Sequence, residues 1–578
     1  MLLHALNDYY ERLAADLDCD IAAYGYSRQQ ISFIVVLEED GTLFEIQDAR
    51  KPDEKGKLKN QSLIVLGSAK PSGSGINPCF LWDNSSYALG YKPDDNKPER
   101  TKEAFEAFRD KHLALKEEID SPEFSAVCTF LETWNPEIVG NDEKTRILTE
   151  VKTGFGVFKL RSKKQYVHES PPITKWWNKQ IEEAEVKDED TIAQCLVSGK
   201  VGPVARLHEP KIKGVWGGQS AGALLVSFND KAYESYGKDG GSNAAVNEQV
   251  AFQYCVALNR LLASEQCIRL GDTSVVFWTD KPSAVEQLLP FALDPSSAAE
   301  DEELANRIGA ILEKISRGKF PGEFGEPDTE FYILGLAPNA ARISVRFWWR
   351  STIQDLTNNL ALHFQNLEIA RGLKDLPHPP MWRLLRETVR DAKDIPDLLE
   401  GALLRAIITG GKYPHLFYSS LLRRIKADRE VRFIRAAAIK ACLNRNYELE
   451  LPVSLDPDRP DMAYHLGRLF AALEKSQEDA LPGINATIKD RYFSSASSTP
   501  ASVFPRLIRM NQHHLGKLEK GAKTYHEKRI QEIAGRIDDF PTHLPMKEQG
   551  QFAIGYYHQR QEIFTRKSKD EPEAATAE

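Results

Sequence analysis

The chain has 578 residues, of which 42% are hydrophobic and 28% are charged, and 84 acidic residues outweigh 75 Lys and Arg to give a net charge of −9. This length predicts roughly three to four domains of ordinary globular composition. The acidic balance argues against a protein that binds nucleic acid over its whole surface, and no stretch approaches the ~18 apolar residues that a membrane span needs. We therefore expect a cytoplasmic protein with no membrane partner.

The cysteines and histidines indicate neither a disulfide framework nor a metal site. Seven cysteines are scattered along the chain without a C-x-x-C pair, and the 13 histidines include no H-E-x-x-H. Zinc and redox sites in proteins use closely spaced thiol or imidazole ligands. We expect no cofactor and no bound metal.

The first third of the chain mixes strands and helices. ISFIVVL (31–37), the turn EEDG and TLFEIQ (42–47) predict a β-hairpin, and QSLIVLG (61–67) predicts a further strand. A glycine- and serine-rich loop follows at 70–75. Apolar residues at helical spacing then predict a helix over 101–120.

The middle third is richer in strands, with a helix expected over 243–262. Runs of β-branched and aromatic residues predict strands at 195–209, 221–229, 273–280, 330–338 and 341–349.

From about residue 351 the pattern is helical, with proline-rich breaks at 378–380 and 451–461. We predict an α+β fold: a mixed N-terminal and middle region with antiparallel sheets, followed by an all-helical C-terminal bundle. The predicted domains are a mixed α/β region (1–350), a helical connecting domain (351–461) and a C-terminal helical bundle (462–578) whose acidic tail begins at about 570.

The strongest local pattern is an amphipathic helix from Ser502, which can cap it, to Gly521, which can end it. At about 100° per residue, apolar and basic side chains fall on opposite sides. A row of cations suits a nucleic-acid backbone, although a merely solvated basic face is the alternative. The apolar residues are Phe504, Leu507, Ile508, Leu515 and Leu518, and the basic ones are Arg506, Arg509, His513, Lys517 and Lys520.

Two glycine-rich loops could approach a nucleic acid closely, because glycine lets the backbone come near a ligand. The loop Lys70–Gly75 carries Lys and Ser donors but is no Walker A sequence, since G-K-[ST] is absent. The loop Gly214–Gly222 follows two lysines and contains Gln219, whose amide can both donate to and accept from a base edge. An ordinary surface loop and an ordinary hairpin turn are the alternatives.

A catalytic interpretation rests on Asp142, Glu150 and Lys152. They weakly match a D…E-x-K arrangement, in which two carboxylates hold Mg²⁺ and a lysine assists phosphodiester hydrolysis. E-x-K arises often by chance in so charged a chain, and no serine-hydrolase or dinucleotide-binding signature is present.

Five strings, spread in order over nearly the whole chain, resemble the large subunit of the type I-C CRISPR surveillance complex, the Csd-type Cascade large-subunit family. They are MLLHALNDYYERL (1–13), GINPCFLWDNSSYALGY (75–91), IKGVWGGQSAGALLVSFNDKAYESYG (212–237), YILGLAPNAARISVRFW (332–348) and GGKYPHLFYSSLLRRIKAD (410–428).

The resemblance implies a subunit that is not an enzyme. It implies recognition of the protospacer-adjacent motif (PAM) in duplex DNA, help in opening the strands into an R-loop, and guidance of the displaced strand. The implied partners are crRNA, target double-stranded DNA and its displaced strand, the Cascade backbone subunits, the subunit that holds the crRNA 5′ handle, the small subunit and a helicase-nuclease. Region 1–350 would then lie near the PAM and the guide 5′ end, and 462–578 would resemble the small subunit.

With this resemblance the local patterns acquire expected roles. Met462 is an expected internal start, from which 462–578 would be made as a separate small subunit. Arg342 and Arg346, alternating along one strand, are expected to contact the guide or a neighbouring subunit. A magnesium-dependent nuclease and a purely structural scaffold for RNA or protein remain the alternatives. The expected PAM contacts are Lys70, Ser72, Ser74, Asn77, Lys211, Lys213 and Gln219, and the expected contacts to a strand backbone are Arg506, Arg509, Lys517 and Lys520.

Overall fold

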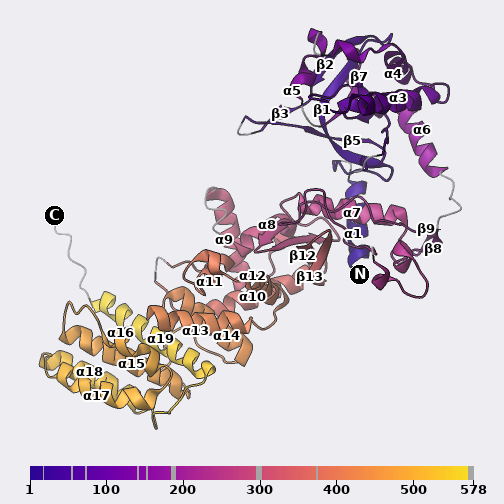
Figure 1. Cartoon of the computed structure of the whole chain (residues 1–578). Coiled ribbons are helices and arrows are strands. Elements are labelled where there is room, and N and C mark those ends of the chain that lie inside the picture. The colour runs from indigo at the N-terminus through magenta and orange to yellow at the C-terminus, as the bar shows by residue number, and fades with distance from the viewer. Residues whose placement is uncertain are drawn as a thin grey trace. The chain divides into compact units, whose positions relative to one another are not determined.

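The computed structural model describes residues 1–570 except 17, 54–55, 72–74, 140–141, 152–153, 184–190, 229, 295–301 and 373–374 (Figure 1). The chain forms two compact units. Unit 1 comprises Met1–Lys213 and Ala221–Arg260, and unit 2 comprises Gly214–Ser220 and Leu261–Glu578. The predicted acidic tail from about 570 lies outside the described residues.

One long strand organises the sheet of unit 1. The first half of β1 (Tyr26–Leu37) pairs antiparallel with β5 (Gln61–Leu66), and its second half pairs antiparallel with β2 (Leu43–Asp48). On its other side β1 runs parallel to β7 (Phe155–Leu160), which pairs with the short β6 (Trp82–Asp83). The predicted hairpin and the strand after it are confirmed.

Both faces of β1 are buried from Ile31 to Leu37, where successive side chains point to opposite faces of the sheet. Phe33 lies in a core with the helices α3 (Pro98–Ala114) and α4 (Pro122–Thr133), and Ile34 lies in a smaller core on the other face. The predicted helix at 101–120 is therefore present as α3. The other helices and strands of unit 1 are α1 (Leu2–Ala15), β3 (Lys51–Pro52), β4 (Leu58–Lys59), α2 (Ser85–Ala88), α5 (Ile147–Glu150), α6 (Pro171–Glu182), β8 (Ile192–Gln194), β9 (Val201–Pro203) and α7 (Glu248–Leu262), whose last two residues belong to unit 2.

Two predicted strands are wrong over most of their length. Within 195–209 only β9 is a strand, and in the described part of 221–229 only residues 223 and 224 form bridges, of which Ala223 pairs with Ile212. Gly222 adopts a φ of +84°, a left-handed conformation that interrupts extended backbone. Several apolar residues here, including Leu196 and Leu207, are exposed, so the β-branched and apolar pattern did not mark sheet pairing.

The sheet of unit 2 is an antiparallel meander in chain order. It consists of β10 (Cys267–Leu270), β11 (Thr273–Thr279), β12 (Glu330–Asn339) and β13 (Arg342–Thr352), which confirms the three strands predicted between 273 and 349. Side chains on one face share a hydrophobic core with α8 (Val285–Leu293), α9 (Glu302–Ser316) and α10 (Ile353–Leu367).

Helices follow the meander to the end of the described chain, which confirms the predicted fold class. One hydrophobic core contains side chains from the sheet and from the helices that follow it. This core marks no boundary at 350 or 461, and the three-part division stays a prediction. Among the described helices none is long and apolar enough to cross a membrane. The remaining helices are α11 (Met381–Arg386), α12 (Asp397–Thr409), α13 (His415–Asp428), α14 (Phe433–Tyr447), α15 (Met462–Ala480), α16 (Ile488–Ala496), α17 (Pro500–Leu515), α18 (Lys520–Ala534) and α19 (Met546–Asp570).

Two glycines allow α15 and α19 to pack backbone against backbone. A Cβ atom on Gly467 would lie 2.0 Å from the Phe552 carbonyl oxygen, and one on Gly555 would lie 2.0 Å from the Tyr464 carbonyl oxygen. No side chain fits at either position, so the contact at the centre of the bundle depends on glycine from both helices.

Candidate nucleic-acid interface

The predicted basic helix at 502–521 is two helices. α17 begins at Pro500 and ends at Leu515, and α18 begins at Lys520. The end that we predicted at Gly521 is wrong, because a turn at 516–519 already breaks the helix. The start is also earlier than Ser502, whose hydroxyl bonds to the Thr499 carbonyl.

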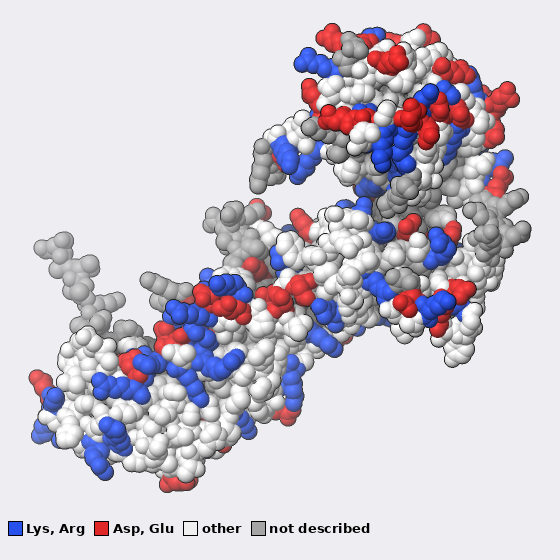
Figure 2. Space-filling model, in the orientation of Figure 1, with Lys and Arg blue, Asp and Glu red and all other residues white. Residues whose placement is uncertain are grey.

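The two-sided character of this segment is confirmed. Phe504, Leu507 and Leu515 are buried, whereas Arg506, Arg509, Lys517 and Lys520 are all exposed. We call these four cations the basic stripe. Figure 2 shows Lys and Arg side chains over this end of the chain, with few Asp and Glu side chains among them.

The charges of the basic stripe are available for a ligand. Arg506 lies 5.5 Å from the centre of the Tyr492 ring, a cation–π contact that leaves its charge intact. Within the part of the chain that the structure describes, none of the other three forms an ion pair. Exposed cations that follow one another along 506–520 can bind a polyanion along its backbone.

Lys70 has a different environment from the one that its loop suggested. Its ammonium lies 2.5 Å from an oxygen of the fully buried Asp83 and 3.4 Å from the centre of the Tyr87 ring, and its side chain is 14% exposed. Burial raises the pKa of Asp83, and the Lys70 charge opposes that rise. The charge of Lys70 is thus compensated inside the protein.

Lys70 also closes the Gly/Ser loop at its base. Its ammonium donates to the Asn77 carbonyl at 3.0 Å, and the Asn77 amide donates to the Tyr87 hydroxyl at 3.3 Å. The Asn77 side chain is exposed. Ser72 and Ser74 lie outside the described residues. The geometry gives Lys70 a positioning role, and the contacts of this loop with the PAM stay a prediction.

The second glycine-rich loop is split between the two units. Lys211 and Lys213 belong to unit 1, where Asn259 bonds to the backbone of both, and the exposed Gln219 belongs to unit 2. Their role as PAM contacts stays a prediction.

Sequence reasoning missed Trp216 in the same loop. Its indole is 51% exposed, its amide donates to the Ser274 hydroxyl at 2.9 Å, and the Arg269 guanidinium lies 3.3 Å from its ring centre. A tryptophan between glycines could have signalled this exposed aromatic platform.

Arg342 and Arg346 lie on β13, but a bulge separates them. The register of β13 against β12 shifts between Val345 and Phe347, which interrupts the alternation that would place both arginines on one face. Arg346 pairs with Asp272 at 2.9 Å, and both side chains are partly exposed. Their contact with the guide or a subunit stays a prediction.

The residues of the nuclease alternative have ordinary structural surroundings. Asp142 accepts from the Lys144 amide at 2.9 Å and so caps a short helical turn, and Glu150 is exposed at the end of α5. Lys152 lies outside the described residues. Among the residues that are described, no group of three His, Cys, Asp or Glu comes close enough to hold a metal ion.

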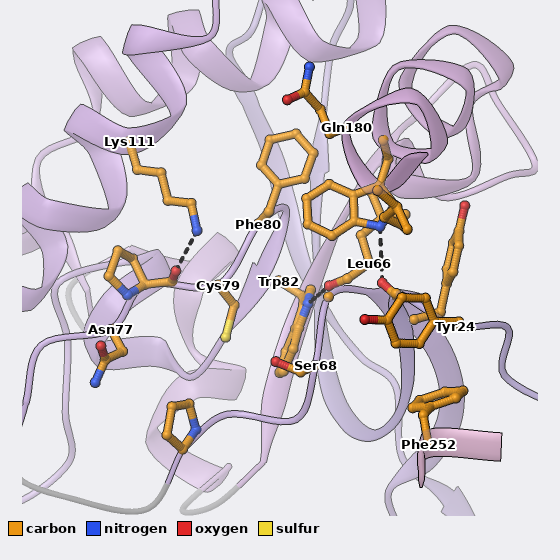
Figure 3. A pocket seen from close by; sticks show the side chains of 17 residues that line it. Tyr24, Leu66, Ser68, Asn77, Cys79, Phe80, Trp82, Lys111, Gln180 and Phe252 are labelled. Atoms are coloured by element: carbon orange, nitrogen blue, oxygen red, sulfur yellow. Dashed lines mark hydrogen bonds between the residues drawn. The ribbon is translucent and has the colours of Figure 1, made fainter. Parts of the chain in front are cut away.

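Unit 1 contains an aromatic pocket of about 490 Å³ that the sequence did not reveal (Figure 3). Leu66, Phe80 and Trp82 are buried and form its floor, and the partly buried rings of Tyr24, Trp177 and Phe252 form its walls. The exposed residues Ser68, Pro71, Asn77 and Gln180 form its rim.

Met462 is the first residue of α15. A chain that started there would therefore begin with the first turn of the central helix of the bundle. Whether such a product is made stays a prediction.

A comparison with protein families identifies the class of this chain as CRISPR-associated. The family model described as CRISPR-associated protein (Cas_Csd1) matches residues 6–564, which is nearly the whole length. The chain therefore belongs to the Csd1 family, and the resemblance to Csd-type large subunits is confirmed. A search of curated proteins found no match.

Proposed function

We propose that this chain is the DNA-recognition subunit of a crRNA-guided surveillance complex and has no active site of its own. It recognises the PAM as duplex, promotes strand opening and R-loop formation, guides the non-target strand and recruits the helicase-nuclease. The observation that carries the proposal is the basic stripe, four exposed cations close together in the chain of net charge −9, on α17, in the turn after it and at the start of α18. Membership of a CRISPR-associated family supports the same role.

The basic stripe holds the backbone of a displaced or target strand, and the two glycine-rich loops hold the PAM-reading residues. Phosphate contacts position a nucleic acid without reading its bases, so the stripe contributes affinity and the loops contribute specificity. The guide and the other subunits supply the remaining positive charge, which is why an acidic chain can take part.

The experiment measures target binding by the assembled guide complex with this chain present or omitted, on duplexes whose PAM is intact or scrambled. The proposal requires that binding depend on the PAM and that this dependence be lost when the chain is omitted. Binding that is the same without the chain would show a scaffold instead. Cleavage of DNA by the purified chain with Mg²⁺ would show the nuclease.

Charge reversal tests the basic stripe. We expect the combined R506E, R509E, K517E and K520E variant to weaken target binding and to flatten its salt dependence, by about 0.7 in slope for each lost contact to a single strand. The matched control reverses two arginines and two lysines that are equally exposed on other helices and loops of unit 2. They are Arg390, Lys393, Arg405 and Lys412.

The control should change the salt slope less than the stripe variant does, while both variants still assemble with the guide complex. Equal slopes for the two variants would show that net charge, rather than this surface, governs binding.

A further inference from the structure

The aromatic pocket of unit 1 has the size and chemistry of a site for one nucleotide. Its volume of about 490 Å³ falls in the range of about 300–1,000 Å³ typical of small-ligand sites. Among the described lining residues, Lys111 is the only charged one, and none is a carboxylate. Aromatic walls beside a single cation favour a flat, aromatic ligand that carries negative charge, as a nucleotide does.

The aromatic rings are held in place before any ligand arrives. The Trp177 indole donates to the Gly25 carbonyl at 3.0 Å, and the Trp82 indole donates to the Leu66 carbonyl at 2.6 Å. Trp177 also stacks on Phe80 with ring centres 5.6 Å apart. Rings that are already fixed lose little conformational entropy when a base stacks against them.

A buried histidine supports the floor of the pocket. Leu81 lies between the floor residues Phe80 and Trp82 and has a φ of +62°, which is unfavourable for a residue with a side chain. Its amide donates to Nε2 of the fully buried His112 at 2.9 Å. This bond holds the turn that presents the two floor rings.

The cation of the pocket has capacity for a phosphate. Nζ of Lys111 donates to the Pro78 carbonyl at 2.8 Å. In the described part of the chain this is its only hydrogen bond, and an ammonium has three donors.

The pocket opens beside the Gly/Ser loop. Pro71, near the start of that loop, and Asn77, just after its end, are both rim residues of the pocket. Lys70 joins the two ends of the loop by donating to the Asn77 carbonyl. A duplex whose PAM contacted the loop would bring its neighbouring nucleotides to the pocket.

We propose that the aromatic pocket captures a single unstacked nucleotide of the DNA next to the PAM, with its base against the aromatic walls and its phosphate toward Lys111. This inference rests on the proposed function. Extruding one base costs stacking and pairing energy, and stacking on protein rings returns part of it. Capture would therefore hold open the first step of strand separation.

The test is photocrosslinking of the assembled complex. Duplexes carry 5-iododeoxyuridine at one position at a time on either strand beside the PAM, and crosslinked peptides are identified by mass spectrometry. A parallel series places 5-iodouridine in the guide. We expect crosslinks from one or two neighbouring DNA positions to Tyr24, Trp177 or Phe252.

A rim substitution adds a functional readout. Ser68 is exposed at the rim, so S68W should fill the pocket without disturbing the core, abolish these crosslinks and weaken binding to PAM duplexes by about tenfold, as loss of one stacked base does. The matched control S62W changes an exposed serine of β5 outside the pocket lining and should leave both readouts unchanged.

The outcomes separate the two levels of the proposal. PAM-dependent binding with crosslinks only outside the pocket, or with equal effects of S68W and S62W, overturns the nucleotide pocket and leaves the proposed function standing. Crosslinks to the pocket from the guide alone would assign the pocket to the guide and overturn the nucleotide pocket as well. Crosslinks from the DNA to a partner subunit in place of the pocket would do the same. Loss of PAM dependence in the unmodified complex overturns the proposed function and the pocket together.

Discussion

Lys70 and Asp83 form an ion pair, and removing it tests whether Lys70 acts only as the counter-ion of Asp83. K70M leaves the buried Asp83 without its cation, and we expect it to lower the free energy of unfolding of unit 1 by about 3–5 kcal/mol. The double variant K70M/D83N removes both charges and should recover much of this loss. Thermal unfolding of the full chain measures both effects.

Target binding by the same variants then assigns the role of Lys70. If Lys70 serves only as the counter-ion of Asp83, the double variant binds PAM duplexes almost as well as the unmodified chain. A double variant that folds but no longer distinguishes the PAM would show that the Lys70 ammonium is needed at the loop itself, where it holds the Asn77 carbonyl.

His112 should make the stability of unit 1 depend on pH. Burial lowers the pKa of His112 to about 4, and its neutral ring accepts from Leu81 through Nε2 while Nδ1 donates to the Phe108 carbonyl at 2.7 Å. The pKa is lower in the folded chain than the usual value of about 6.5. The folded state therefore resists protonation, and stability should fall by about 1.4 kcal/mol per pH unit between about pH 6.5 and 4.

The measurement compares the pH dependence of unfolding in the unmodified chain and in H112Q, whose amide can still accept from Leu81. Other buried histidines contribute to the overall slope in both proteins. We expect H112Q to lower the number of protons taken up on unfolding in this pH range by about one. Identical slopes would show that His112 takes up a proton as readily in the folded chain as in the unfolded one.

At this scale the sequence predicted exposure better than it predicted pairing. The four cations of the basic stripe are exposed as the helical period predicted, although only Arg506 and Arg509 lie on α17. The partner of Lys70 could not be predicted, because Asp83 meets it only after the turn around Leu81 folds back.

The contact between α15 and α19 should be intolerant of even one methyl group. G467A would place a Cβ atom 2.0 Å from a backbone oxygen of α19, and we expect a loss of about 1–3 kcal/mol or more, because neither backbone can move away. The control G401A lies within α12, where an added Cβ meets no atom within 4 Å, and should stabilise that helix by up to about 1 kcal/mol. Thermal unfolding of both variants measures the difference, and equal effects would contradict the close packing.

Elements were predictable where one pattern extended over their whole length. The hairpin of β1 and β2 and the meander strands carry continuous β-branched and aromatic runs, and they are confirmed. The helix expected at 502–521 was predicted too long, because its basic and apolar periods continue across the turn at 516–519. A periodic pattern does not show where the backbone breaks.

Met462 allows a test of the internal start on the whole molecule. M462L keeps an apolar side chain of similar volume at the first residue of α15 and should leave the full-length chain folded. With a C-terminal tag, we expect a second, smaller product from the natural coding sequence and its disappearance in M462L. A smaller product that persists in M462L would have to arise from proteolysis or from another start.

The aromatic pocket shows what the sequence cannot predict about the assembled molecule. Its lining comes from several segments between Tyr24 and Phe252 that no local period connects. Each tryptophan and phenylalanine, taken alone, would be predicted to be a core residue, and most of them are. Only the fold shows that these rings line one cavity together with Lys111 and with Pro71 and Asn77 of the Gly/Ser loop region.

The helix α19 leaves the ribosome after α13 to α18, yet much of unit 2 is built around it. Besides α15, it packs against the earlier helices: the Tyr418 hydroxyl donates to the Met546 carbonyl, the Tyr557 hydroxyl donates to the Ala370 carbonyl, and Gly550 leaves room for Tyr418. During synthesis, the helices from α13 onward keep apolar surface exposed until α19 has been made and can pack against them. A nascent chain stalled or truncated before α19 would therefore be a target for chaperones and proteases rather than a shorter working subunit.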